Sequence, residues 1–141
     1  MTDVPTDALP FRHDIALRAA DLDYLGHVTE VLHVAMFEEA RFVLLREVMA
    51  AERPVYVVGA HALRFRREIR LHDGPVSVHL GIVQVGERGF DLVEHLVAAD
   101  GTLRTSSTAT LLAFDLETRR SRPLSDGEAA GARRHLLVPD R

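Results

Sequence analysis

The 141-residue sequence contains no cysteine. This absence excludes disulfide bridges, cysteine-ligated zinc and a cysteine nucleophile, and it fits a cytoplasmic protein. No apolar run approaches the roughly 18 residues that a membrane-spanning helix needs. Residues 1–10 contain acids and prolines but no apolar core segment, so we expect neither a signal peptide nor a membrane partner.

Basic residues are not in excess either. The chain has 17 Lys and Arg against 21 Asp and Glu, which gives a net charge of −4. Nucleic-acid-binding proteins normally show a strong basic excess, so we expect no nucleic acid partner. The eight histidines are scattered without a His-Glu-x-x-His motif, so we expect no bound metal. A Gly-x-Ser-x-Gly motif, a phosphate-binding glycine loop and a dinucleotide fingerprint are also missing.

What is present is the composition of an ordinary globular domain. Apolar residues make up 47% of the chain and charged residues 27%. The length suits one domain with a hydrophobic core of its own. We therefore expect a flexible tail over residues 1–10 and a single domain over residues 11–141.

The most informative stretch runs from Asp21 to about Val48. An acidic loop containing Gly26 leads into a segment of helix formers that neither Gly nor Pro interrupts before Pro54. Apolar residues cover more than a narrow stripe of this helix, which predicts that another layer wraps it. The first N–H groups of the helix have no intrahelical partner and carry the positive end of its dipole. Asp23 lies just upstream of them.

The remainder of the chain shows the patterns of strands and turns. Five segments combine alternation or β-branched residues with flanking turns, and we expect strands at 11–18, 55–67, 76–82, 90–98 and 102–115. A short helix is expected over 125–135, with Ser125 as N-cap and Glu128 completing a capping box. A strand, a long helix and a four-stranded antiparallel meander predict an α+β fold in which a curved sheet packs on the helix.

The pattern Asp-x-Asp-x-x-Gly-His-Val over residues 21–28, followed by Phe-Glu-Glu-Ala-Arg over residues 37–41, resembles the hotdog-fold thioesterases of the 4-hydroxybenzoyl-CoA thioesterase type. The resemblance covers roughly residues 11–123. It implies a hotdog fold and hydrolysis of acyl-CoA or acyl-carrier-protein thioesters. It also implies a homodimer whose sheets join edge to edge, or a homotetramer. It implies no cofactor, because coenzyme A enters as part of the substrate.

Asp23 is the first catalytic candidate. A thioesterase needs a group that activates water or attacks the carbonyl, and it needs a hydrogen-bond donor for the oxyanion. The resemblance gives the first role to Asp23 and the second to main-chain N–H groups near Thr29 and Glu30. On the residues alone, a cap for a turn or for the helix is the simpler interpretation of Asp23, and the resemblance is what favours the catalytic role.

Two further loop residues belong to the candidate site. Gly26 permits a tight turn and the close approach of an acyl group. His27 is a candidate for orienting the substrate or handling a proton, because imidazole changes its charge near neutral pH. A purely structural loop histidine is the alternative.

The sequence departs from the family pattern at the start of the helix. Many relatives have Gly-His-Val-Asn-Asn where this chain has Thr29 and Glu30 in the last two positions, and a tyrosine common in the first helical turns is His33 here. Thr29 can still cap the helix through its hydroxyl. Glu30 adds a second carboxylate, which would raise the proton affinity of its neighbour. It either assists as a base or marks altered or lost catalysis.

Glu38 and Glu39 are adjacent on the helix and cannot both face inward. The resemblance makes Glu38 the inward residue, paired with Arg41 or another arginine. An ion pair on the helix surface is the alternative.

Arginines are densest at the end of the second expected strand: Arg64, Arg66, Arg67 and Arg70. Arginine binds phosphates through two parallel hydrogen bonds, which suits the phosphates of coenzyme A. Arg88 falls where the resembling enzymes place CoA contacts, and the adjacent Gly89 would offer its main chain. A solvated, charged strand edge is the alternative interpretation.

The leading hypothesis is an acyl-CoA or acyl-carrier-protein thioesterase, and two others stay open. A non-catalytic hotdog protein would bind acyl thioesters or only assemble, and the departures at Thr29, Glu30 and His33 favour it. A hotdog dehydratase or hydratase would use an Asp–His or His–Glu pair, for which His27 near Asp23 is the only hint.

Overall fold

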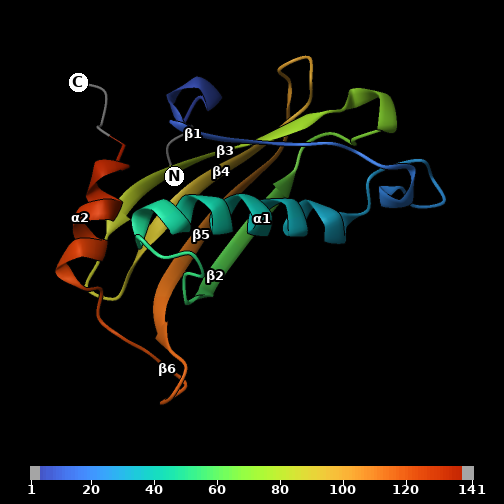
Figure 1. Ribbon diagram of the computed structural model, residues 1–141. Helices are drawn as coiled ribbons and strands as arrows, with labels where there is room; N and C mark the ends of the chain where they lie inside the picture. The colour runs from blue at the N-terminus through green and yellow to red at the C-terminus, as the bar shows by residue number, and fades with distance from the viewer. Residues whose placement is uncertain (1–3, 138–141) are drawn as a thin grey trace.

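One long helix lies across a curved antiparallel sheet in the computed structural model, which describes residues 4–137 (Figure 1). The helices are α1 (Glu30–Val48) and α2 (Asp126–Arg134), with short 3-10 turns at Thr6–Ala8, Ala19–Asp21 and Leu71–Asp73. The strands of this part of the chain are β1 (Phe11–Ile15), β2 (Tyr56–Phe65), β3 (Val76–Val85), β4 (Gly89–Val97), β5 (Leu103–Asp115) and β6 (Arg120–Ser121). None of the helices in residues 4–137 is long and apolar enough to span a membrane.

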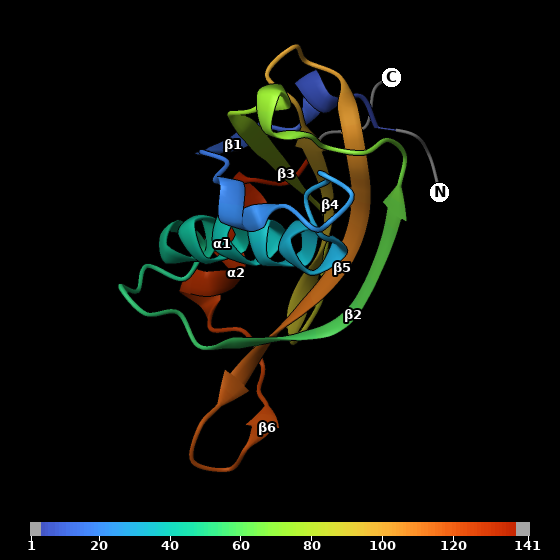
Figure 2. The ribbon, with the colours of Figure 1, turned by 90° about the vertical axis from the view of Figure 1, so that its right-hand side faces the viewer.

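The strand order explains why the long helix lies where it does. The order is β1-β3-β4-β5-β2, so β3, β4 and β5 pair with their sequence neighbours while β1 and β2 take the two outer positions. The chain must cross the sheet between β1 and β2, and α1 makes that crossing. Figure 2 shows the sheet curling around the helix, with the hairpin of β5 and β6 extending beyond it.

The hydrophobic core lies between α1 and the face of the sheet turned toward it, here called the inner face. Side chains two residues apart on a strand share a face, and on β3 Val78, Leu80 and Ile82 are all fully buried. The helix contributes a matching apolar set: Phe37, Ala40, Leu44, Leu45 and Val48. The predicted α+β hotdog architecture, a long helix wrapped by a curved antiparallel sheet, is confirmed.

The five expected strands and both helices are present, with shifts at their ends. β1 stops at Ile15, and β3 continues to Val85. The predicted capping box of α2 is confirmed, because the Glu128 amide donates to Ser125 Oγ at 3.1 Å and the Ser125 amide donates to Glu128 Oε1 at 2.9 Å. The sequence did not predict β6.

The N-terminal segment differs from the flexible tail that we expected over residues 1–10. Residues 1–3 lie outside the described part, but residues 4–10 cross the outer face of the sheet, which points away from α1. Leu9 is buried, and Thr6 Oγ1 lies 2.7 Å from Nδ1 of His95 on β4. Leu9 packs over Gly81, where a Cβ would approach the leucine to 2.9 Å. The packing of Leu9 on Gly81 therefore fixes this segment to the outer face of the sheet.

Candidate active site

The loop ahead of α1 is a tight turn organised by Asp23. The Oδ1 atom of Asp23 accepts hydrogen bonds from the amides of Leu25 at 2.9 Å and His27 at 3.2 Å. Gly26 has a φ of 79°, which lies in the left-handed region that glycine adopts without strain. The interpretation of Asp23 as a turn cap and of Gly26 as its permissive residue is therefore confirmed. The Oδ2 atom of Asp23 makes no hydrogen bond within residues 4–137, so it is available to a ligand.

The start of α1 carries unsatisfied donors. Thr29 occupies the N-cap with an extended backbone, but its side chain makes no capping hydrogen bond. The expected cap through the Thr29 hydroxyl is therefore not formed. Within the described chain, the main-chain N–H groups of Glu30 and Val31 donate to no other group, as the geometry of a helix start dictates. The Glu30 side chain is exposed.

His27 ties this loop to the connection between β2 and β3. Its Nε2 atom forms an ion pair with Glu68 when the imidazole is protonated, and the Val28 amide donates to the Ile69 carbonyl at 2.8 Å. Only the main chain of His27 contacts Asp23; the imidazole faces Glu68.

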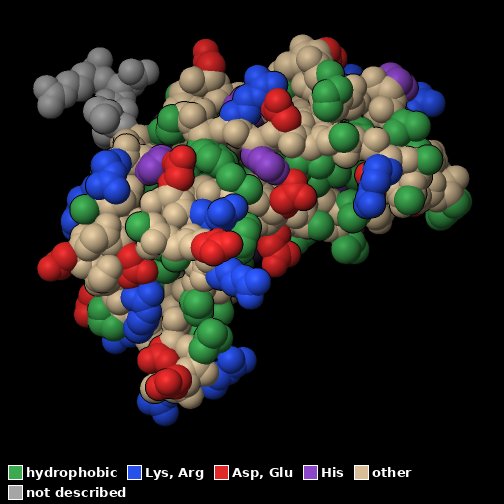
Figure 3. Space-filling view, viewed as in Figure 1, with side chains coloured by type: hydrophobic (Ala, Val, Ile, Leu, Met, Phe, Trp, Pro, Cys, Tyr) green, Lys and Arg blue, Asp and Glu red, His purple; other side chains and the backbone are tan. Residues whose placement is uncertain are grey.

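Large apolar side chains surround the same end of α1. Tyr24 is 95% exposed, Val31 73% and Leu25 59%. Figure 3 shows hydrophobic side chains gathered at the end of the molecule that carries this loop. Exposed apolar groups of this size, next to one another, are typical of a binding surface.

The prediction that Glu38 faces inward is wrong. Glu38 and Glu39 are both exposed, and Glu39 lies 2.7 Å from His13 on β1. The buried stripe of α1 passes through Phe37 and Arg41 at helical spacing, which leaves Glu38 on the flank of the helix and Glu39 on the side away from the core. Arg41 is the inward-facing charge, and its partner is not a helical residue.

A buried polar network on the inner face was missed by the sequence analysis. Arg41 binds Glu94 of β4 through Nε–Oε2 at 2.5 Å and Nη2–Oε1 at 2.7 Å. The hydroxyl of Ser107 donates to Glu94 Oε1 at 2.7 Å, and His61 Nε2 lies 2.9 Å from Arg41 Nη2. Burial and then the charge of Arg41 lower the pKa of His61. The signal available in the sequence was a glutamate among the apolar residues Leu92, Val93 and Leu96 of β4.

His33, which stands where relatives often have tyrosine, joins the first turn of α1 to β5. Its Nδ1 atom lies 2.8 Å from Thr105 Oγ1, and its ring meets Phe65 edge-on at 5.2 Å between centroids. Burial lowers the pKa of His33. The neutral ring therefore links the helix start to the end of β2, where Phe65 lies.

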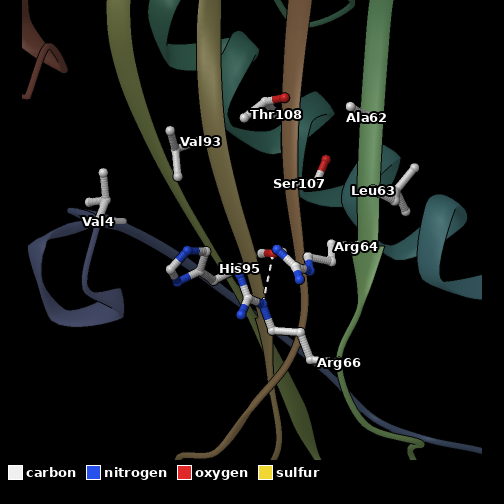
Figure 4. Close-up of a pocket in the computed structure, with 10 residues that line it drawn as sticks. Val4, Ala62, Leu63, Arg64, Arg66, Val93, His95, Ser107 and Thr108 are labelled. Atoms are coloured by element: carbon white, nitrogen blue, oxygen red, sulfur yellow. Dashed lines mark hydrogen bonds between the residues drawn. The ribbon is translucent and has the colours of Figure 1, made fainter. Parts of the chain in front are cut away.

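The structure divides the predicted CoA-binding residues into two groups. Arg64 and Arg66 line a pocket of about 340 Å³ on the outer face (Figure 4), and the exposed Arg67 follows them. Arg88 lies in the turn between β3 and β4, where its guanidinium donates to the Ser121 carbonyl at 3.0 Å. Since Gly89 begins β4 and the pocket lies six residues further along that strand, the two groups are roughly 20 Å apart.

Gly89 has a packing role of its own. A Cβ there would lie 1.8 Å from the Leu111 carbonyl oxygen, so only glycine allows β4 and β5 to approach this closely. A main-chain contact from Gly89 to CoA stays a prediction. Within residues 4–137, no group of three or more His, Asp or Glu side chains is placed to hold a metal ion.

Comparison with known proteins defines the class. The model of the Thioesterase-like superfamily matches residues 17–131, which include the loop of Asp23, α1 and the whole of β2 to β5. The chain therefore belongs to the Thioesterase-like superfamily. The narrower 4-hydroxybenzoyl-CoA type stays a prediction, and no curated protein sequence matches this chain at a significant level.

Solved structures share the fold. A thioesterase from Thermus thermophilus, complexed with coenzyme A and zinc, has a TM-score of 0.81 and 23% identity over 94% of this chain and 98% of that one. A predicted thioesterase from Bacillus stearothermophilus has a TM-score of 0.79 and 22% identity over 92% and 98%. A 1,4-dihydroxy-2-naphthoyl-CoA thioesterase from Synechocystis has a TM-score of 0.71 and 18% identity over 86% and 94%.

Proposed function

We propose that this protein hydrolyses acyl thioesters of coenzyme A at the start of α1. The observation that carries the proposal is that the N–H groups of Glu30 and Val31 have no acceptor within residues 4–137, next to a loop in which Asp23 Oδ2 likewise accepts no hydrogen bond from that part of the chain. Membership of the Thioesterase-like superfamily supports this reading of the geometry.

The chemistry follows from these groups. The thioester oxygen accepts hydrogen bonds from the N–H groups of Glu30 and Val31, which polarise the carbonyl; one such donor is worth about 10²–10³ in rate. Asp23 Oδ2 takes a proton from water as the oxygen of that water attacks the carbonyl carbon. Collapse of the tetrahedral intermediate breaks the C–S bond, and the thiolate takes up a proton. A direct attack by Asp23, forming an anhydride that water then opens, uses the same groups.

The apolar surface at this end supports an acyl substrate. Tyr24, Leu25 and Val31 surround the start of α1 and are largely exposed. The outer edge of β2 has no partner strand within residues 4–137. Unpaired edges favour pairing with another chain, so we propose a homodimer through β2 that covers part of this surface, with the acyl group between the subunits.

The first test compares Asp23→Asn with wild type on short, long and aromatic acyl-CoAs, following free thiol. Asparagine keeps the shape of the side chain but removes the base, so we expect kcat to fall at least about 100-fold. The matched control is Asp14→Asn, which alters an exposed carboxylate on β1. Turnover that survives in Asp23→Asn would assign the chemistry to Glu30. If the wild type cleaves neither acyl-CoA nor carrier-protein thioesters, the protein is a non-catalytic binder.

A hydratase is the second candidate, because the structure contains a His–Glu pair. His27 and Glu68 meet beside the same loop, and both side chains are partly exposed. Such a pair would add water to a 2-enoyl thioester, with loss of absorbance from its double bond and no release of thiol. An absorbance change that His27→Gln abolishes would favour this activity over hydrolysis.

A further inference from the structure

A second pocket opens on the outer face, beside the outer strand β1. Its volume is about 380 Å³, which lies within the roughly 300–1,000 Å³ of small-molecule sites. We call it the N-terminal pocket, and its polar lining consists of Thr6, Asp7, Arg12, Ser77 and His79. It therefore brings a hydroxyl nucleophile, a base and a cation to one cavity, away from the loop of Asp23.

The segment ahead of β1 forms one wall of this pocket. Leu9 packs over Gly81 of β3, and Thr6 Oγ1 lies 2.7 Å from Nδ1 of His95 on β4. These two contacts hold the segment against the outer face, so that Thr6 and Asp7 border the cavity. The pocket is therefore formed by the fold itself, without a ligand to organise it.

Ser77 and His79 are paired inside the pocket. They alternate on β3 with the buried Val76 and Val78, so both side chains lie on the outer face. Ser77 Oγ lies 2.9 Å from His79 Nε2, which is the distance between a nucleophile and its general base. Burial and then the charge of Arg12 lower the pKa of His79. The imidazole is therefore neutral near pH 7, and with its proton on Nδ1 it can accept the proton of the serine hydroxyl.

Arg12 supplies the positive charge of the site. It is directly opposite His79 in the register of β1 and β3, and such neighbours have Cβ atoms about 4.5–5.5 Å apart. Its Nε atom donates to Asp14 Oδ1 at 2.8 Å, which orients the guanidinium. Its Nη groups make no hydrogen bond within residues 4–137. They can therefore donate to an oxygen that becomes negative during a reaction at Ser77.

The remaining lining limits the substrate. Arg12 and Asp7 are the charged residues among the described ones that line the pocket, and their charges cancel. Pro75, Val97 and Ala98 add apolar surface. A cavity of this size and balance suits a small, uncharged molecule with a short acyl group.

We propose that Ser77, His79 and Arg12 form a second hydrolytic site, which cleaves small uncharged carboxylic esters. Ser77 Oγ attacks the carbonyl carbon while its proton passes to His79 Nε2, and the negative oxygen lies against Arg12. Collapse breaks the C–O bond, the alcohol leaves with the proton from His79, and the acyl group stays on Ser77. Water then attacks this acyl group with His79 as base, which releases the acid and restores the hydroxyl.

An alkyl fluorophosphonate tests the serine directly, because an activated hydroxyl displaces its fluoride and keeps the phosphonyl group. Mass spectrometry should find one label per wild-type chain, on the peptide that contains Ser77. Ser77→Ala should take up no label, and His79→Gln should react at least about 100-fold more slowly. The matched control is Ser121→Ala, which removes a serine of β6 outside the pocket and should react as the wild type does. An unlabelled wild type, or a label on another residue, overturns the proposal.

Ester turnover separates this site from the start of α1. Release of p-nitrophenol from p-nitrophenyl acetate should fall at least about 100-fold in Ser77→Ala and about tenfold or more in Arg12→Ala. In Asp23→Asn, thioester hydrolysis should be lost while the ester is still cleaved. Ester cleavage that disappears in Asp23→Asn would belong to the start of α1 and would refute the second site. Ester cleavage by Ser77 in a protein that cleaves no thioester would refute the proposed function alone.

Discussion

Arg41 and Glu94 form a charged pair in the middle of the core, with exposed fractions of 1% and 0%. Two hydrogen bonds join their side chains, and Ser107 donates a third to the carboxylate. The side-chain polar atoms buried in the described part of the chain all have partners. Removing one member of this network costs much folding free energy, because the others are buried where water cannot replace the lost partner.

We predict that Glu94→Gln lowers the free energy of unfolding by about 3–5 kcal/mol, since it leaves the Arg41 guanidinium buried without a counter-charge. Urea denaturation measures this loss. Asp14→Asn breaks the exposed pair with Arg12 and should cost no more than about 1 kcal/mol. Similar losses in the two variants would show that the buried pair contributes no more than a surface one.

The close contact between α2 and α1 requires a glycine at position 131. At Gly131, a Cβ would lie 2.2 Å from the Val48 carbonyl oxygen near the end of α1. At Gly127, in the first turn of the same helix, a Cβ would meet nothing within 4 Å. The two glycines therefore separate the effect of packing from that of helix propensity.

Gly131→Ala should destabilise the protein by about 1–3 kcal/mol, because overpacking displaces α2 and outweighs the better helix propensity of alanine. Gly127→Ala should instead stabilise it by up to about 1 kcal/mol. Thermal unfolding of the two variants beside the wild type provides the measurement. Destabilisation of equal size at both positions would mean that the close contact with α1 is not the cause.

At the scale of the whole molecule, the unpaired edge of β2 is the feature that predicts assembly. We predict a dimer in solution, with twice the 15.7 kDa of one chain. Val58 on β2 is 43% exposed, and Val58→Glu would bury an unpaired carboxylate at that edge, which costs several kcal/mol and so weakens the dimer more than 100-fold.

Light scattering after size exclusion reads the mass directly. The matched control is Val83→Glu, because Val83 is similarly exposed at 41% but lies on β3. A dimer that survives Val58→Glu and dissociates with Val83→Glu would place the interface at β3 and not at β2.

Local sequence patterns predicted the elements of this molecule, and the errors arose where distant parts meet. Turns and alternation indicated the strands, and the Asp23 turn was recognisable from its own residues. α1 is apolar on many sides, so periodicity did not show that both Glu38 and Glu39 are exposed, and Glu38 was misplaced. Glu94 is 53 positions from Arg41, and their pairing depends on where β4 lies in the sheet.

Distance along the sequence also limited how much of the outer pocket could be predicted. The arginines at 64 and 66 were evident as a basic stretch, but His95 and Ser106 join them only because β4 and β5 lie beside β2. Arg88 was grouped with them through the family resemblance, although the sheet places it at the opposite end. Residue type and resemblance therefore identified the candidates, and topology decided which of them lie together.

The crossing of α1 between the two outer strands has a consequence during protein synthesis. β1 pairs with β3, and β2 pairs with β5, so the first half of the chain emerges from the ribosome before either partner strand exists. The hairpins of β3, β4 and β5 close short loops and form quickly, whereas the outer strands must wait for them. Until translation passes residue 115, the sheet that covers α1 is incomplete, so the nascent chain exposes apolar surface of this helix that the finished fold buries.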